Sequence, residues 1–279
     1  MGFHTCFAFI LVFCAALTQS RRPGRCDHLD ARRSISIVES LMLPDKALLL
    51  KAVGAAHTTG VWLQVGSNTM DGKMNDNDPT LNFLQHIPLW NKVFVEPMPD
   101  AFMQLKRNVA RWPNSKALNA AISEGDAPEA TTQMFCLAEA MVEGWEKTIP
   151  SWLRSLPDGH PDKKLFKTWA NQICSLDTAH VRKHFPYQPQ ATINVTALSF
   201  SRFLSKHAIK DVQVLLIDTE SYDYKVLKQV PLGSMRPALI IWEHVHIQKE
   251  EQLAALEFVR SHCYAAFDLR DGNTVAIAL

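Results

Sequence analysis

The chain has little of what marks several common protein classes. Its 279 residues include 11 glycines but no GxGxxG motif, so the fingerprint of a dinucleotide-binding protein is absent. It has no CxxC pair, so a zinc site is not expected. The formal net charge is only +1, and no long run of lysine or arginine occurs. A nucleic-acid partner is therefore not predicted.

No apolar run is long enough to cross a bilayer comfortably, which takes about 20 residues. The run Cys6–Leu17 is followed by small and polar residues up to Ser20, and then by Arg21 and Arg22. This order is typical of a secretory signal peptide over residues 1–20. We therefore expect a chain of the secretory pathway, luminal or secreted, with no stable membrane span after processing. An anchor formed by the same segment and an organellar presequence are the alternatives.

Few cysteines remain if residues 1–20 are removed: Cys26, Cys136, Cys174 and Cys263. In an oxidising compartment four cysteines can form disulfides, with three pairings available. Asn194 begins the one glycosylation sequon, which a secreted chain can use, so a glycoprotein is expected.

The remaining chain is predicted to consist of a linker with helices over 21–59 and one α/β domain over 60–279. Pro44 is expected to divide the helical pattern of residues 30–56. In the domain, short apolar runs alternate with helical patterns, as in a mostly parallel sheet with helices on both faces. Asp271-Gly272 between two alternating runs predicts a C-terminal hairpin with an antiparallel strand. The predicted strands are 61–65, 92–96, 116–123, 212–217, 238–242, 264–269 and 274–279, and the predicted helices include 79–87, 100–112, 196–206 and 248–262.

Residues suited to binding a ligand follow three of these strands. Gly66 opens a turn after the first strand, Glu96 ends the second, and Asp218 and Glu220 follow the run that begins at Val212. In open α/β sheets, ligands bind beyond the carboxyl ends of the strands, and an acid after the second strand can accept hydrogen bonds from a ribose. The alternative role for Asp218 and Glu220 is to cap the next helix.

Residues 141–190 interrupt the alternation of strands and helices. A long insertion in a compact domain is usually a lid or a binding loop. Its tryptophans are expected either to stack on a flat ligand face or to hold the insertion to the body. Its histidines, among them His180 and His184, are interpreted as surface residues, and no metal site is predicted.

Read together, these segments indicate a relationship. From about Gly60 to Leu279 the chain resembles the FkbM-type methyltransferase family. Three departures occur: Ser221 stands where the family usually has glycine, Gln64 replaces a common acid, and Ser67 replaces a frequent alanine. The segments that carry the resemblance are LQVGSN, NDNDP, VFVEPMPDAFMQLKRN, LNAAIS, LLIDTESYDYKVLKQV and LIIWEH.

The resemblance implies a Rossmann-like methyltransferase sheet and S-adenosylmethionine as cofactor. It also implies O-methylation of a carbohydrate or other small hydroxyl compound. The implied cofactor-binding residues are Gln64, Gly66, Ser67 and Asn68 at the methionine end, Glu96 and Pro97 at the ribose, Asn119, Ala121 and Ser123 at the adenine, and Asp218.

Methyl transfer to a hydroxyl requires a base, and the resemblance places Asp218, Glu220, Glu243 and His244 near the acceptor. His244 is the first choice because the ordinary pKa of histidine lies closest to neutral pH. Asp218 would orient the cofactor or the base, and Glu220 and Glu243 would position hydroxyl groups. A divalent metal held by the three acids and the histidine is a less favoured alternative. The alternative function is a secreted glycan-binding module that kept the fold and lost the chemistry.

Overall fold

The computed structural model describes residues 46–70, 79–125, 129–138, 155, 157, 172–186, 189–269 and 271–279. The expected signal peptide and most of the expected linker lie outside these residues. The described part forms a seven-stranded sheet with the order β3-β2-β1-β7-β8-β10-β9 and a three-stranded sheet with the order β4-β6-β5. The chain is therefore α/β, as predicted, with a smaller second sheet that the sequence did not indicate.

The main sheet is parallel except for β10, which runs antiparallel to both of its neighbours. This is the predicted C-terminal hairpin, and Gly272 in its turn adopts a positive φ of 87°. The strands are β1 (Val61–Val65), β2 (Asn91–Val95), β3 (Ser115–Leu118), β7 (Val212–Ile217), β8 (Leu239–Glu243), β9 (Tyr264–Asp268) and β10 (Asn273–Ala278).

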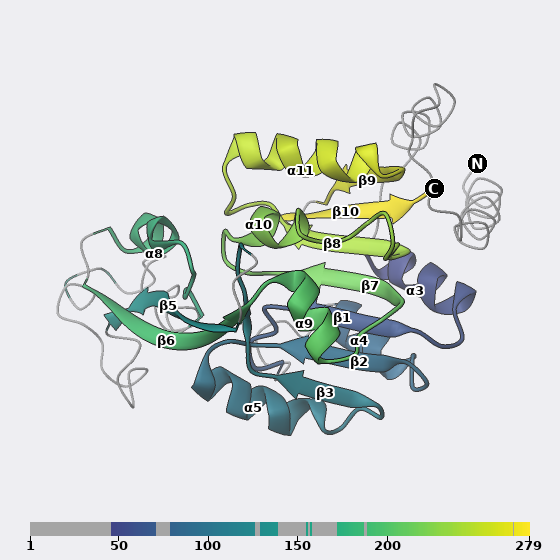
Figure 1. Ribbon diagram of the computed structural model, residues 1–279, viewed down its shortest axis with the longest axis horizontal. Helices are drawn as coiled ribbons and strands as arrows, with labels where there is room; N and C mark the ends of the chain where they lie inside the picture. Colours follow the sequence, from purple (N-terminus) through teal and green to yellow (C-terminus); the bar gives the residue numbers. More distant parts are fainter. Residues whose placement is uncertain are drawn as a thin grey trace.

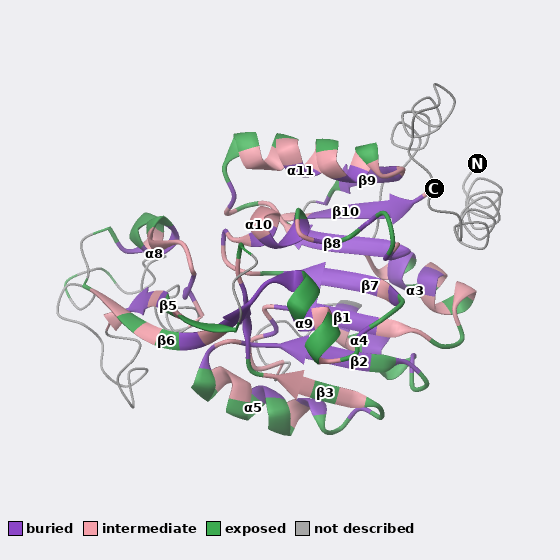
Figure 2. Cartoon of the chain, in the orientation of Figure 1, coloured by how far each residue is buried: buried purple, intermediate pink, exposed green. Residues whose placement is uncertain are grey.

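Helices cover both faces of this sheet because its strands are apolar on both sides. One buried cluster joins Leu63 and Leu215 to side chains of α9, α10 and α11. The other joins Trp62 and Leu216, which are adjacent to those residues on the same strands, to side chains of α3, α4 and α5. Figure 2 shows the central strands buried along their length. The helices are α3 (Lys46–Ala56), α4 (Pro79–Gln85), α5 (Pro99–Val109), α9 (Phe200–Lys206), α10 (Asp223–Leu227) and α11 (Lys249–Ser261).

The second sheet consists of β4 (Ala121–Ile122), β5 (Ala130–Leu137) and β6 (Gln190–Leu198), and α8 (Thr178–His184) packs against β5. Figure 1 shows the β5–β6 ribbon and α8 projecting beyond the edge of the main sheet where β2 and β7 end. The departure from the alternating pattern therefore begins well before residue 141.

Two predictions about this region were wrong. Residues 116–123 do not form one strand, because the chain leaves the main sheet between β3 and β4 and pairs next with β6. Residues 196–198 belong to β6 rather than to a helix, and α9 begins only at Phe200. The β-branched residues of β6 pair with β5 over its full length, and this long-range pairing overrides the local helical pattern.

A disulfide joins Cys136 of β5 to Cys174, just before α8. Two backbone hydrogen bonds between Phe135 and Ser175, of 2.8 and 3.0 Å, reinforce the junction. Cys263 is also disulfide-bonded. Among the described residues, no helix combines the length and the apolar character needed to cross a membrane.

Candidate active site

A cavity of about 460 Å³ lies where β1, β2 and β7 end, in the range typical of small-molecule sites. The second sheet contributes Met134 from β5, and the segment before α8 contributes Cys174. The site is therefore a pocket between the main sheet and the β4-β6-β5 sheet. Of the residues predicted from sequence, it is lined by Gln64, Gly66, Ser67, Asn68, Glu96, Pro97, Ala121, Asp218, Glu220 and Glu243.

Gly66 forms the turn that brings the ends of β1 and β7 together. Its φ is +80°, and a Cβ at this position would lie 1.6 Å from the carbonyl oxygen of Asp218. The turn is fixed on its other side by hydrogen bonds from the Gly66 and Ser67 amides to Val95 O, of 3.0 and 2.9 Å. Only glycine fits this geometry without displacing the backbone.

Glu96 is 6% exposed, and its carboxylate is held by two backbone amides. Asn68 N donates to Oε2 at 2.8 Å, and Met98 N donates to Oε1 at 2.9 Å. Burial raises the pKa of Glu96 to about 7, the two amides oppose this rise, and the charges of Asp218 and Glu220 add to it. The group is thus fixed in position and titrates near neutral pH.

Gln64 is 7% exposed, and its Oε1 has no hydrogen-bond partner among the described residues. Its Nε2 contacts Met70 Sδ at 3.6 Å. A buried acceptor without a donor costs free energy unless a ligand supplies one. An ammonium group in this cavity would do so.

Asn119 and Ser123 are not among the residues that line the cavity. Asn119 Nδ2 donates to the backbone oxygens of Glu96 and Pro97, at 2.8 and 3.0 Å, so it shapes the loop after β2. Ser123 N donates to Leu198 O and thereby extends the β4–β6 pairing. Both have structural positions next to the site rather than within it.

Three acids from neighbouring strand ends share the cavity: Asp218, Glu220 and Glu243. Burial raises the pKa of Glu220 to about 7. Burial, together with the charges of Asp218, Glu220 and Asp223, raises the pKa of Glu243 to about 10. Such crowding of carboxylates favours a positively charged ligand.

The turn that carries Asp218 and Glu220 contains two consecutive left-handed residues. Glu220 has φ 52° and Ser221 has φ 75°. Position 221, where the resemblance leads us to expect glycine, therefore has a real backbone requirement, which serine meets with some strain. Ser175 Oγ donates to Glu220 O at 2.6 Å and ties the turn to the segment before α8.

The structure does not support His244 as the first choice of base. His244 is not among the residues that line the cavity, and its Nδ1 lies 2.9 Å from Thr274 Oγ1 on β10. The strand ends at Glu243 and the chain bends over residues 245–247. The bend returns His246 to the side of Glu243, with 3.7 Å between His246 Nε2 and Glu243 Oε1.

The sequence reasoning missed three histidines. His184 and His246 line the cavity, and His180 is 2% exposed, so its interpretation as a surface residue was wrong. One signal was available: His180 and His184 are four residues apart, as two ligands on one helical face would be.

The sheet order, the hairpin and the pocket at the strand ends together define a Rossmann-like methyltransferase fold. The family model of the methyltransferase FkbM domain matches residues 64–267, which is most of the chain. The chain therefore belongs to the FkbM methyltransferase family. No curated protein and no solved structure matched it.

Proposed function

We propose that the protein transfers a methyl group from S-adenosylmethionine to a hydroxyl group of a carbohydrate or another small molecule. One observation carries the proposal: Glu96 after β2 and Asp218 after β7 open into a single cavity, beside the glycine turn after β1. In sheets of this type, nucleoside ligands bind at this position. The family membership supports the same reaction class.

The residues present fit the proposed cofactor. The fixed carboxylate of Glu96 can accept hydrogen bonds from the ribose hydroxyls. Gln64 Oε1 can accept from the ammonium group at the methionine end. The crowded acids beside Gly66 suit the positive sulfonium. Met98, Ala121 and Ile122 supply apolar surface for the adenine.

The transfer itself is a displacement at the methyl carbon. S-adenosylmethionine would supply a methyl group activated by its sulfonium, leaving S-adenosylhomocysteine, and the acceptor hydroxyl would give up its proton. Positioning can supply most of the acceleration, since correctly oriented groups react far faster than free ones. The protein's tasks are therefore to align the acceptor and to take one proton.

We propose that Asp218 is the base that accepts the proton of the acceptor hydroxyl. Glu243, with a pKa of about 10, is protonated at neutral pH and serves as a donor to an acceptor hydroxyl. Glu220 Oε2 lies 2.9 Å from His180 Nε2, which favours a role beside the histidines rather than at the acceptor. Asp218 follows β7 beside the glycine turn and lines the same cavity, so it is the acid left to accept the proton.

We also propose that the protein works in the secretory pathway. The Cys136–Cys174 disulfide supports an oxidising compartment, because such bonds are rare where thiols are kept reduced. Asn194 is exposed on β6, so its sequon is accessible for glycosylation.

The affinity for S-adenosylhomocysteine should depend on pH through Glu96. Ribose hydroxyls donate to the ionised carboxylate, and the pKa of Glu96 in the free protein is about 7. Binding should therefore tighten about tenfold between pH 6 and pH 8, as the ionised fraction rises. Glu96→Gln should weaken binding and remove most of this dependence. Calorimetry at several pH values measures both effects.

Glu257→Gln, on the exposed side of α11, is the matched control and should retain the pH profile of the unmodified protein. The folding stability of the ligand-free protein should depend on pH in the opposite direction. A raised folded-state pKa stabilises the fold below about pH 4.5, and this contribution is lost as pH rises through about 7. If the affinity of Glu96→Gln for S-adenosylhomocysteine depended on pH as steeply as that of the unmodified protein, Glu96 would not be the group that binds the ribose.

Asp218→Asn should reduce methyl transfer by about 100-fold or more, the usual effect of losing a general base. Its affinity for S-adenosylhomocysteine, which carries no sulfonium charge, should change little. His244→Ala should retain activity, because this side chain lies outside the cavity. The measurement is labelled-methyl incorporation into an acceptor found by mass spectrometry in a screen of glycans and hydroxylated metabolites.

Equal activity of Asp218→Asn and the unmodified protein would refute the assignment of the base. Glycan binding without any binding of S-adenosylhomocysteine would instead support the non-catalytic alternative.

A further inference from the structure

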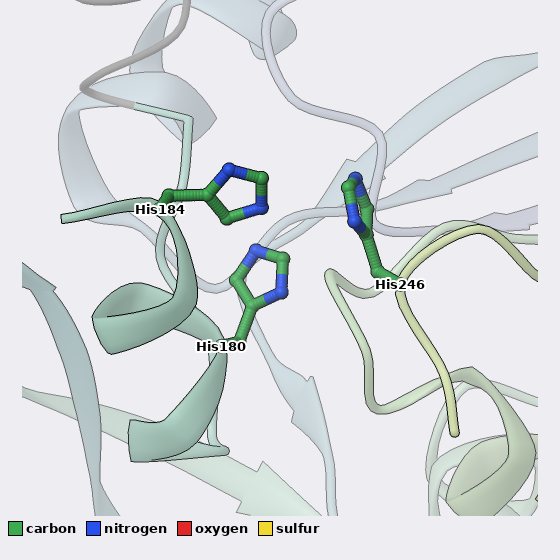
Figure 3. Close-up of side chains that lie close together, drawn as sticks. All are labelled: His180, His184 and His246. Atoms are coloured by element: carbon green, nitrogen blue, oxygen red, sulfur yellow. The ribbon is translucent and has the colours of Figure 1, made fainter. Parts of the chain in front are cut away.

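Three histidines from two distant parts of the chain form a compact cluster beside the cavity. His180 and His184 come from one face of α8, and His246 comes from the bend after β8. Their ring centroids form a nearly equilateral triangle, with separations of 4.8, 5.0 and 5.0 Å (Figure 3). One ring nitrogen from each lies within 4.8 Å of the others. The geometry brings three imidazole ligands around one point.

These histidines lack the hydrogen bonds that buried imidazoles usually make. Both ring nitrogens of His180, Nε2 of His184 and Nδ1 of His246 are buried without a hydrogen-bond partner among the described residues. Buried polar atoms without partners cost free energy. A cation bound between the rings would use these lone pairs.

Two carboxylates stand at the edge of the cluster. Glu220 Oε2 lies 2.9 Å from His180 Nε2, although the two atoms do not have hydrogen-bond geometry. Glu220, Glu243 and His246 also offer ligand atoms within 4.8 Å of one another. Ligand atoms that share one ion at bond lengths of about 2.0–2.2 Å lie roughly 3–3.5 Å apart. A small contraction of this cluster would reach that spacing.

We infer that His180, His184, His246 and Glu220 form a binding site for a divalent transition metal of the zinc class. Three imidazoles with one carboxylate suit zinc and related ions, whereas magnesium and calcium prefer sites made of oxygen ligands alone. The site differs from a purely acidic metal site, since most of its ligands are nitrogens. Glu243 Oε1 lies 3.7 Å from Nε2 of His246, one of the proposed ligands of the ion.

The metal would add a second link between the α8 region and the main sheet, beside the hydrogen bond from Ser175 Oγ to Glu220 O. His180 and His184 belong to residues 174–184, which we call the α8 arm and which the disulfide joins to β5. His246 and Glu220 follow strands of the main sheet. Binding would therefore hold α8 against the main sheet. His184, Glu220 and His246 also line the cavity, so the ion would face a bound acceptor. This last consequence, orienting an acceptor hydroxyl, rests on the proposed function.

The test uses the full chain with its purification tag removed, stripped with a chelator and titrated with Zn²⁺ or Co²⁺. We expect about one ion per chain by elemental analysis, and visible absorption bands when Co²⁺ binds. His184→Ala and His246→Ala, which replace the more exposed members of the cluster, should each weaken Zn²⁺ binding by about 100-fold or more. Zn²⁺ should also slow proteolysis of the α8 arm in the unmodified protein.

His86→Ala, an exposed histidine far along the chain, is the control and should bind Zn²⁺ normally. Unchanged circular dichroism and an unchanged melting temperature, both measured without metal, will show that the variants are folded. Far less than one ion per chain in the unmodified protein, or equal Zn²⁺ affinity in all three variants, would overturn the site. Failure to bind S-adenosylhomocysteine while Zn²⁺ still binds would contradict the proposed function and leave the metal site intact.

Discussion

Gly66→Ala should unfold the end of the main sheet locally and abolish binding of S-adenosylhomocysteine. The new Cβ would lie 1.6 Å from Asp218 O, and the residue would keep a φ of +80° only under strain. The clash is with backbone, so no side-chain rotation relieves it. We expect a loss of stability of roughly 4 kcal/mol or more, at the upper end of single substitutions. Urea unfolding and calorimetry measure the two effects.

The reason for so large an effect is that this turn has no room to adjust. Asp218 N donates to Val65 O at 2.9 Å, and Gly66 N donates to Val95 O at 3.0 Å. Moving either strand end would break one of these hydrogen bonds and displace Glu96 or Asp218. Gly233→Ala is the matched control, because a Cβ there meets no atom within 4 Å. A Gly66→Ala protein as stable as this control would contradict the described turn.

Removing the Cys136–Cys174 disulfide should destabilise the second sheet and the α8 arm by about 4 kcal/mol. This value follows from the entropy of closing a loop with a sequence separation of 38 in the unfolded chain. The expected result for the Cys136→Ala, Cys174→Ala double variant is a melting temperature lower by roughly 10 °C. Proteolysis of α8 should become faster.

The Cys136→Ser, Cys174→Ser double variant distinguishes the loss of the bond from the cost of burying polar groups in its place. Both cysteines are buried, so serine adds the cost of burying hydroxyl groups, whereas alanine mainly removes the bond. We expect the serine variant to be the less stable of the two. If the alanine variant had the same melting temperature as the unmodified, oxidised protein, the bond would not stabilise this arm.

Much of the main sheet could be predicted from the sequence because its strands are buried on both faces. VWLQV and VQVLLI are short apolar runs with no helical alternative, and both form strands, β1 and β7. The positions of Gly66, Glu96 and Asp218 at strand ends followed directly. The Asp271-Gly272 turn likewise fixed the closing hairpin, since a positive φ is required there.

The second sheet could not be predicted in the same way. β6 is a mixture of exposed and buried residues with a local pattern compatible with a helix near its end. It becomes a strand because β5, about 60 residues earlier, pairs with it over eight positions. Such pairing depends on the path of the whole insertion, which no local window contains.

The sequence by itself determined the class of fold and which acids stand at the sheet edge, because apolar periodicity and turn chemistry are local properties. Only the tertiary structure decided which side chains share the cavity. Alternation along an extended strand would separate His246 from Glu243, but the chain bends after β8 and places them together. The packing of α8 against β5 then adds His180 and His184. Contacts between segments this distant are set by packing of the whole chain, and no short motif encodes them.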